Sequence, residues 1–348
     1  MLKMHRQNKK HELLWQTLRK QKFRVALSLS SGGAEAMGRD LAFMEMIAEL
    51  GIDWDEVHGT SAGASVGAVH AYWHVLPDSQ VKPANIPKNK IKTAKEIREG
   101  FLSTTKFSNV FEPSLGAFRT ILKERSVKAV TAFFSGRKLE NKIMEGLESA
   151  TFADAEKEVF IYAEREKDLG YEIFSKETHP HIRLHEAVRA SLSIPFFFEP
   201  KEISGISYID GGMLVNTPLW HIVSHHKKKY PKHPLLILAC TNLYPYRPPP
   251  LPENFWELIK FRYYQKILYR NFYRELELTM GENKVFLWLF YPKREPIRSF
   301  AFHKMGDYMK TAKTDFYEHY FQFLSHIEFT KVRKKLKLKY PYKIPEFV

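Results

Sequence analysis

The sequence predicts an α/β fold in which a mostly parallel sheet is sandwiched by helices. Residues 25–29 and 57–59 are short apolar runs of the kind that form buried strands, and each leads into a segment that reads as a helix. In the first of these segments Leu41, Met44 and Ile47 fall on one helical face. Strands that alternate with helices build parallel sheets, and such folds place their sites at the carboxyl ends of the strands.

The second helical segment begins at a Gly-x-Ser-x-Gly pattern, Gly59-Thr60-Ser61-Ala62-Gly63. A serine on a sharp turn between a strand and a helix needs nearly side-chain-free neighbours two residues away, and glycine supplies them. The following helix directs its first N–H groups and its positive dipole end at the turn, which favours a developing oxyanion. Ser61 is therefore a candidate nucleophile, although the pattern alone also fits a turn in which Ser61 only caps the helix.

Two further glycine-rich turns accompany this pattern. Gly32 and Gly33 follow the first strand, and glycines there let backbone N–H groups turn towards a ligand oxygen, as an oxyanion hole requires. Residues 208–212, Tyr-Ile-Asp-Gly-Gly, read as a strand that ends in a turn at Asp210. Each segment read alone is also a common structural turn. Between them lies the sequence Ala-Ser-Leu-Ser-Ile-Pro at residues 190–195.

Taken together and in this order, the four segments resemble the patatin-like phospholipases over about residues 23–220. The resemblance implies a catalytic dyad of Ser61 and Asp210 and lipid acyl hydrolase activity, with no cofactor and no metal. No metal-ligand spacing is visible in the sequence either. The remaining site residues that it implies are an oxyanion hole at Gly32, Gly33 and Ala34, and an elbow shaped by Gly59 and Gly63.

The oxyanion loop departs from the family pattern, which usually reads Gly-Gly-Gly-x-Arg/Lys-Gly. Here the basic position holds Glu35 or Ala36, and the next glycine arrives late, at Gly38. Arg39 is the candidate to supply the missing charge and to contact an anionic lipid. The departure puts the efficiency of the oxyanion hole in question without touching Ser61.

In a dyad, Asp210 would take the Ser61 proton directly, which requires burial to raise the basicity of the carboxylate. The alternative is an α/β-hydrolase triad with a histidine after Asp210. That fold normally places several strands before its elbow, whereas one convincing strand precedes the run leading to Ser61, which favours the dyad. The histidines that follow Asp210 and could serve a triad include His221, His225, His226 and His303.

The composition suggests a basic, peripheral membrane protein. The 348 residues include 54 Lys and Arg against 39 Asp and Glu, a formal net charge of +15. Such a charge suits nucleic acid or an anionic membrane surface, and no nucleic-acid-binding motif is visible. Residues 1–24 lack the apolar core of a signal peptide, and no run approaches about 18 apolar residues. We expect a cytoplasmic chain that associates peripherally with membranes. The sequence has no feature that indicates its oligomeric state or that decides for or against export without a leader.

The chain is expected to divide into a basic N-terminal arm at 1–22, a catalytic domain at 23–243 and a basic, aromatic-rich helical region at 244–348. The proline-rich segment 245–252 sets the last boundary. Within the catalytic domain, residues 93–150 read mainly as helix and are expected to form a cap or acyl pocket.

Segment 255–276 reads as a basic amphipathic helix. Its basic residues recur at four-residue spacing and fall along one side: Arg262, Lys266, Arg270 and Arg274. Such a helix suits a membrane interface and these residues could contact anionic lipid. It is equally compatible with a helix docked on the catalytic domain through its apolar side.

The expected activity is of the phospholipase A or lysophospholipase type, through an acyl-enzyme on Ser61. Two alternatives stay open. One is a general esterase, a thioesterase or a triacylglycerol lipase on the same dyad. The other is a catalytically weak membrane-binding scaffold, which the altered oxyanion loop and the large basic C-terminal region suggest.

Overall fold

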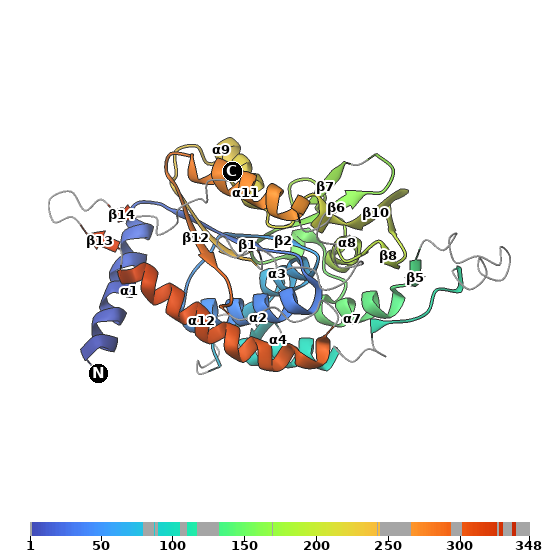
Figure 1. The fold of residues 1–348 in the computed structure, drawn as a ribbon, viewed down its shortest axis with the longest axis horizontal. Helices are drawn as coiled ribbons and strands as arrows, with labels where there is room; N and C mark the ends of the chain where they lie inside the picture. Colours follow the sequence, from blue (N-terminus) through green and yellow to red (C-terminus); the bar gives the residue numbers. More distant parts are fainter. Residues whose placement is uncertain are drawn as a thin grey trace.

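A mixed sheet lies at the centre of the computed structural model of this chain (Figure 1). The structure describes residues 2–78, 87, 90–104, 110–116, 132–168, 170–241, 243, 266–293, 301–325, 327–329 and 336–338. Within them the sheet has eight strands in the order β12-β11-β1-β2-β6-β10-β9, with β7 paired to β6. Its strands are β1 Arg24–Leu29, β2 Glu56–Thr60, β6 Glu158–Arg165, β7 Tyr171–Phe174, β9 Lys201–Ile203, β10 Ile206–Asp210, β11 Leu235–Cys240 and β12 Val285–Phe290.

The sheet is mostly parallel, as predicted. The pairs β12–β11, β11–β1, β1–β2 and β2–β6 are parallel, whereas β7, β9 and β10 join by antiparallel pairing. Strand β11 is fully buried along its length, and its side chains alternate between two clusters. Leu236 and Leu238 pack in one cluster, and Leu235 and Ile237 in the other. Burial on both faces explains why these strands read as continuous apolar runs.

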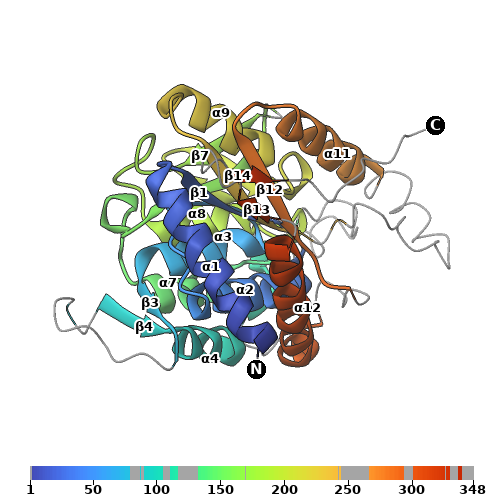
Figure 2. The ribbon, with the colours of Figure 1, turned by 90° about the vertical axis from the view of Figure 1, so that its left-hand side faces the viewer.

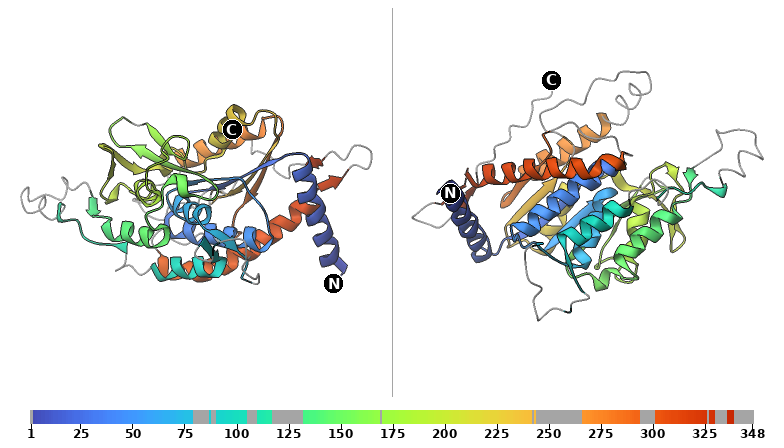
Figure 3. Two further views of the ribbon diagram at one scale, coloured as in Figure 1. Left: turned by 180° about the vertical axis from the view of Figure 1, so that it is seen from behind. Right: turned by 90° about the horizontal axis from the view of Figure 1, so that it is seen from below.

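Helices cover both faces of the sheet (Figures 1 and 3). Helices α2, α3, α4 and α12 lie on one side and α9 and α11 on the other. Of two further helices, α8 packs on β6 and β10, and α7 packs on α8 and α3. Their bounds are α2 Gly33–Glu49, α3 Ala62–Tyr72, α4 Ala94–Thr104, α7 Arg137–Leu147, α8 Leu184–Ser191, α9 Leu219–Lys229, α11 Lys266–Met280 and α12 Met305–Ser325. The predicted α/β sandwich is thereby confirmed.

Three two-stranded pairs complete the described elements. They join β3 His74–Leu76 with β4 Ile91–Thr93, β5 Ala132–Phe134 with β8 Phe196–Phe198, and β13 Ile327–Phe329 with β14 Leu336–Leu338. The pair β5–β8 is parallel and lies beside α7 and α8 (Figure 1).

The N-terminal helix α1, Leu2–Lys20, packs against α12 near the other end of the chain (Figure 2). Leu14 and Leu18 are buried there, and the indole N–H of Trp15 donates to the hydroxyl of Tyr320 over 2.9 Å. Leu13 is 46% exposed. The predicted basic arm is therefore a helix that docks through Leu14, Trp15 and Leu18.

The region after residue 243 contributes to the same core. Strand β12 pairs with β11 along its full length, and α12 packs along α2. Phe316, Tyr320 and Phe323 of α12 are buried, so this aromatic-rich helix is part of the core. The three-domain division stays a prediction, and the proline-rich boundary at 245–252 lies outside the described residues.

Candidate active site

The carboxyl ends of β2 and β10 meet along one edge of β6. Strand β2 pairs with β6 up to the pair Thr60–Tyr162, and β10 takes over at Asp210–Ala163, one residue further along β6. Because β10 runs antiparallel to β6, its last residue comes next to the residue that follows β2. The topology therefore brings Ser61 and Asp210 together, although 149 positions separate them in the sequence.

Ser61 lies on a strained turn between β2 and α3. Its φ of 54° is in the left-handed region, which is sparsely populated by non-glycine residues. A β-carbon on Gly59 would lie 2.5 Å from the carbonyl oxygen of Gly63, and one on Gly63 would lie 2.4 Å from that of Leu29. The turn thus requires both glycines. The Ser61 side chain makes no capping bond to α3, so the helix-cap interpretation is wrong.

The Ser61 hydroxyl donates instead to the carboxylate of Asp210. Its Oγ lies 2.6 Å from Oδ2, and the N–H of Gly212 donates to Oδ1 over 2.7 Å. Both side chains are nearly inaccessible to water, with Ser61 2% and Asp210 7% exposed. The geometry is that of a nucleophile held directly by a candidate base.

Burial raises the pKa of Asp210 to about 6, against the hydrogen bonds from Ser61 and Gly212, which act to lower it. Glu164 adds a like charge that raises it further. The carboxylate is therefore more basic than a surface aspartate and is still ionised at neutral pH.

The loop Gly32–Ala34 joins β1 to the first turn of α2. The N–H groups of Gly33 and Ala34 open the helix and have no partner four residues earlier within it. Ser31 is tied to Asn216, because its N–H donates to the Asn216 carbonyl over 3.0 Å and its Oγ accepts from Nδ2 over 2.5 Å. The loop is thereby fixed to the chain that follows Asp210. Its role as an oxyanion hole stays a prediction.

Arg39, suggested from the sequence as a contact for anionic lipid, lies in the protein interior, which disfavours that role. Its side chain is fully buried, and its guanidinium pairs with Glu35 and Asp40, both at 3.1 Å. It also donates to the hydroxyl of Ser30 over 2.8 Å, at the start of the oxyanion loop. The family pattern has a basic residue in this loop. In this chain Arg39 instead forms a buried network with Glu35, Asp40 and Ser30, which contacts the start of the loop.

No role for Ser191 was predicted from the sequence, but in the structure its hydroxyl hydrogen-bonds to the backbone of the turn at Ser61. The N–H of Ser61 donates to its Oγ over 2.8 Å, and that hydroxyl donates in turn to the carbonyl of Tyr162 over 2.6 Å. Ser191 could have been found from the sequence, because it lies in the Ala-Ser-Leu-Ser-Ile-Pro segment that resembles the family. Asn216 lies in no recognised motif and could not.

An apolar cavity of about 250 Å³ adjoins the site. Gly33 and Ala62 line it next to the loop and the elbow. Much of its remaining wall is apolar and comes from α4, α7 and neighbouring segments, with Ile97, Phe111, Leu139, Ile143 and Phe198 among the lining residues. Residues from 93–150 therefore form much of this wall, where a cap or acyl pocket was expected.

Among the described residues, the side-chain oxygens of Asp210 accept from Ser61 and Gly212, and neither bond involves a histidine. His221 packs against Tyr162, and the Nε2 of His226 lies 2.8 Å from the carbonyl of His233. His303 is exposed on a short helical turn before α12. The geometry thus favours the dyad over the triad.

Helix α11 is docked on the sheet through Phe272 and Leu276, which are buried in one cluster with side chains of β11 and β12, and Leu268 of the same helix is also buried. Arg270 and Arg274 are exposed on its other side. Arg262 lies outside the described residues, as does the side chain of Lys266. This arrangement agrees with a docked helix that has a solvated basic side, and lipid contact there stays a prediction. In the described part of the chain, no helix has the length and apolar character needed to span a bilayer.

The fold, the elbow and the Asp-Gly-Gly turn together define a known class. The chain matches the patatin-like phospholipase family over residues 27–222, more than half of its length, and belongs to this family. It is also 34% identical over 73 residues to the probable lipid hydrolase 463L of invertebrate iridescent virus 6. That match covers 21% of this chain and 25% of the relative, so it spans only a quarter of that protein's length.

Solved structures show a more distant likeness. VipD from Legionella pneumophila is 14% identical, with a TM-score of 0.37 over 86% of this chain and 67% of VipD. Human GIVD cytosolic phospholipase A2 is 12% identical, with a TM-score of 0.40 over 70% of this chain and 47% of that protein.

Proposed function

We propose that this chain hydrolyses acyl esters of glycerophospholipids or lysophospholipids through a Ser61–Asp210 dyad. The observation that carries the proposal is the buried 2.6 Å hydrogen bond from Ser61 Oγ to Asp210 Oδ2, next to an apolar cavity. Membership of the patatin-like phospholipase family supports the same substrate class.

The chemistry follows from the placement of the groups. Ser61 Oγ attacks the ester carbonyl carbon while its proton moves to Asp210, and the carbonyl oxygen becomes an oxyanion near the N–H groups of Gly33 and Ala34. Collapse expels the alcohol, which takes the proton from Asp210 and leaves an acyl ester on Ser61. Water then attacks this ester with Asp210 again as base, which releases the fatty acid and restores the serine.

The cavity supports an acyl chain as the bound group. Its walls carry Phe111, Leu139 and Phe198, and it begins at Ala62, next to the nucleophile. Each methylene of an acyl chain buried against such walls contributes about 0.8 kcal/mol. A long acyl chain therefore gains far more from this site than a small polar ester does.

Exposed aromatic side chains beside the cavity support peripheral binding to a lipid surface. Phe196 is 70% exposed and Phe133 is 48% exposed, and both belong to the paired strands β5 and β8. Phe198, at the end of β8, lines the cavity. Exposed apolar side chains on elements that also line a site favour contact with an apolar phase. The net charge of +15 supports an anionic surface.

The test is fatty-acid release from phosphatidylcholine vesicles, with and without an anionic phospholipid. We expect Ser61→Ala to lower the rate by about 10³-fold or more, and Ser224→Ala, which changes an exposed serine of α9, to leave it unchanged. Phe196→Ser should weaken vesicle binding several-fold, and anionic vesicles should be hydrolysed faster than neutral ones.

The alternatives give different results in the same assays. Cleavage of short esters, acyl thioesters or triacylglycerol without cleavage of phospholipid would point to those substrates on the same dyad. Vesicle binding without any Ser61-dependent release would refute the hydrolase proposal and favour a membrane-binding scaffold.

A further inference from the structure

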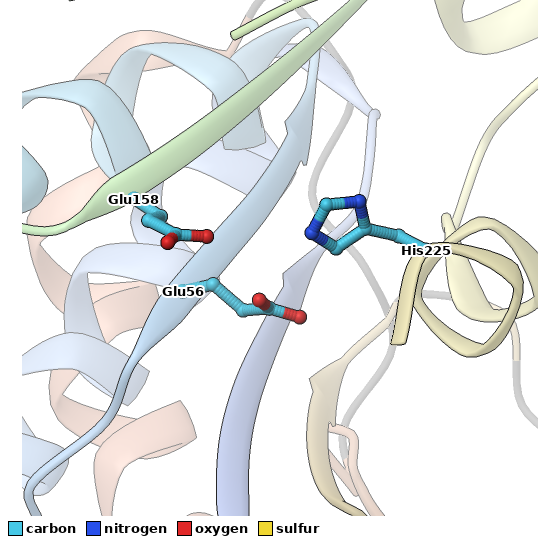
Figure 4. Close-up of side chains that lie close together, drawn as sticks. All are labelled: Glu56, Glu158 and His225. Atoms are coloured by element: carbon cyan, nitrogen blue, oxygen red, sulfur yellow. The ribbon is translucent and has the colours of Figure 1, made fainter. Parts of the chain in front are cut away.

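Three side chains converge at the end of β2 that is far from Ser61. They are Glu56 at the start of β2, Glu158 at the start of β6 and His225 of α9, and Figure 4 shows them facing a common space. One potential ligand atom from each lies within 4.8 Å of the other two. Ser61 follows the opposite end of β2, roughly 16 Å away at about 3.3 Å per residue, so this cluster is separate from the dyad.

Buried polar atoms in this cluster have no hydrogen-bond partner. They are Oε1 of Glu56, Oε2 of Glu158 and Nε2 of His225. The side chain of Glu56 is fully buried, so water does not compensate it from the surface. Buried polar groups are nearly always satisfied in folded proteins, and a bound ion or water is one of the explanations for an exception.

The other polar atom of each residue is engaged by a neighbour outside the cluster. Oε2 of Glu56 accepts from Arg24 over 3.2 Å, and Oε1 of Glu158 accepts from the hydroxyl of Tyr230 over 3.3 Å. Nδ1 of His225 lies 3.9 Å from the carboxylate of Glu177.

Hydrogen bonds thus hold one oxygen of Glu56 and one of Glu158, the Glu177 carboxylate lies near Nδ1 of His225, and the second atom of each residue is left for the common space. Such outer partners orient the ligands in established metal sites, where a metal-bound imidazole typically faces a carboxylate or carbonyl with its other nitrogen.

We propose that Glu56, Glu158 and His225 bind one zinc ion. Two carboxylate oxygens and one imidazole nitrogen form a mixed donor set that suits zinc, whereas calcium and magnesium prefer oxygen alone. Ligand atoms around a tetrahedral zinc lie about 3.4 Å apart, given bonds of about 2.0–2.1 Å. Small side-chain rotations therefore close the present separations, and a water completes the fourth position.

His58 and Arg24 also lie next to this space and compete with a metal ion for the two carboxylates. Nε2 of His58 lies 3.5 Å from Oε1 of Glu56, and the guanidinium of Arg24 lies 3.9 Å from Oε2 of Glu158. A bound water or a shift of Arg24 would satisfy the same atoms without a metal. Because the three ligands come from β2, β6 and α9, zinc would tie a helix to the two central strands and act as a structural clamp.

The test uses the full chain after treatment with a chelator and dialysis. Titration with ZnCl₂ should show one site per chain, and the melting temperature should rise by several degrees when zinc saturates the site. Glu158→Gln and His225→Ala should each abolish the stoichiometric binding and the thermal shift. His181→Ala, which removes an exposed histidine elsewhere, should keep both.

X-ray absorption at the zinc edge of the wild type requires no variant and should show only nitrogen and oxygen ligands. Absence of stoichiometric zinc on the wild type would overturn the proposal. Equal binding and an equal thermal shift in His225→Ala and the wild type would overturn it as well, since zinc would then sit elsewhere. Because the readouts are binding and melting, the result is independent of whether the dyad hydrolyses lipids.

Discussion

Two buried carboxylates lie near opposite ends of β2, and their pKa values are shifted in opposite directions. Glu56 begins β2, and Asp210 of β10 lies beside Ser61, which follows β2. At the carboxyl end, burial raises the pKa of Asp210 to about 6. At the amino end, burial also acts to raise the pKa of Glu56, but His58, His225 and Arg24 together lower it to about 2. The comparison shows that burial alone does not decide the state of an acid, because the hydrogen-bond donors and charges around it also act on its pKa.

The hydrogen bonds differ in the same way. Around Asp210 both carboxylate oxygens have donors. Around Glu56 one oxygen accepts from Arg24, whereas the other has only Nε2 of His58 nearby, at 3.5 Å and without a well-formed hydrogen bond. This difference accords with the two proposals, proton transfer at the carboxyl end of β2 and a bound ion at its amino end.

The sharpest test of this contrast is Asp210→Asn. Loss of the base should lower kcat/KM by about 10³-fold. The variant should nevertheless be more stable above pH 6. The folded pKa of about 6 exceeds the ordinary value of 3.8, so the folded state binds the proton more tightly, and stability falls as pH rises from about 4 through 6. Asparagine avoids this loss, which amounts to roughly 3 kcal/mol at most.

Thermal melts at pH 5 and pH 8 measure the stability change, with Asp168→Asn as an exposed control. In the wild type, kcat/KM should fall about tenfold per pH unit below pH 6 as Asp210 is protonated. A pH-independent rate between pH 4 and 8, or a destabilised variant at pH 8, would contradict the assignment of Asp210 as a buried base.

Gly63→Ala tests the steric side of the carboxyl end. The added carbon would lie 2.4 Å from the carbonyl oxygen of Leu29, and that backbone belongs to the central strand β1. We expect a loss of roughly 3 kcal/mol in the free energy of unfolding, together with loss of activity. In Gly100→Ala, where the added carbon meets no atom within 4 Å, a denaturant titration should show no loss. Equal behaviour of the two variants would mean that the elbow is not closely packed.

Glu56→Gln tests the amino end. Removing the charge leaves Arg24 and His58 beside a neutral amide, so the chelator-treated protein should lose about 2–4 kcal/mol of stability. The sign is opposite to that expected for Asp210→Asn above pH 6. Urea titration at pH 7 measures it, with Glu202→Gln as the exposed control. A gain in stability would remove the contrast between the two ends.

Tyr308→Phe asks how far the support of the carboxyl end extends. The Tyr308 hydroxyl of α12 donates to Glu35 over 2.5 Å, in the first turn of α2 next to the oxyanion loop. Because this bond is buried, its loss should cost about 1–2 kcal/mol. Tyr317→Phe removes an exposed bond from the same helix to Glu49 and should cost less than about 0.5 kcal/mol. Indistinguishable denaturation midpoints would show that α12 gives the loop no such support.

The site at the carboxyl end of β2 could be predicted from the sequence because the turns at Ser61 and Asp210 depend on residues next to them in the chain. A sharp turn at Ser61 demands glycine at 59 and 63, and the strand ending at Asp210 is followed at once by the glycine whose N–H holds the carboxylate. The first two strands and the helices that follow them were predicted from apolar runs and helical periodicity for the same reason. What the sequence did not show was why the two segments meet, since the shared edge of β6 is a property of the assembled sheet.

The amino end could not be read in this way. Glu56, Glu158 and His225 come from three segments far apart in the sequence, and the intervals between them match no common metal-binding motif. Arg39 illustrates the same limit, because a basic residue near a site reads as a ligand contact until burial shows that it pairs with Glu35 and Asp40. Long-range packing decided both cases.

The position of β12 has a consequence for any shortened form of the chain. A polypeptide ending at residue 243 would keep β11 and lose the strand that pairs with it. The backbone N–H and C=O groups along one side of Leu235–Cys240 would then be unpaired, beside apolar side chains that are now fully buried. Open edges of this kind recruit strands from other molecules and lead to aggregation. Because β12 covers this edge of the sheet, we expect a chain shortened at residue 243 to self-associate more than the full chain.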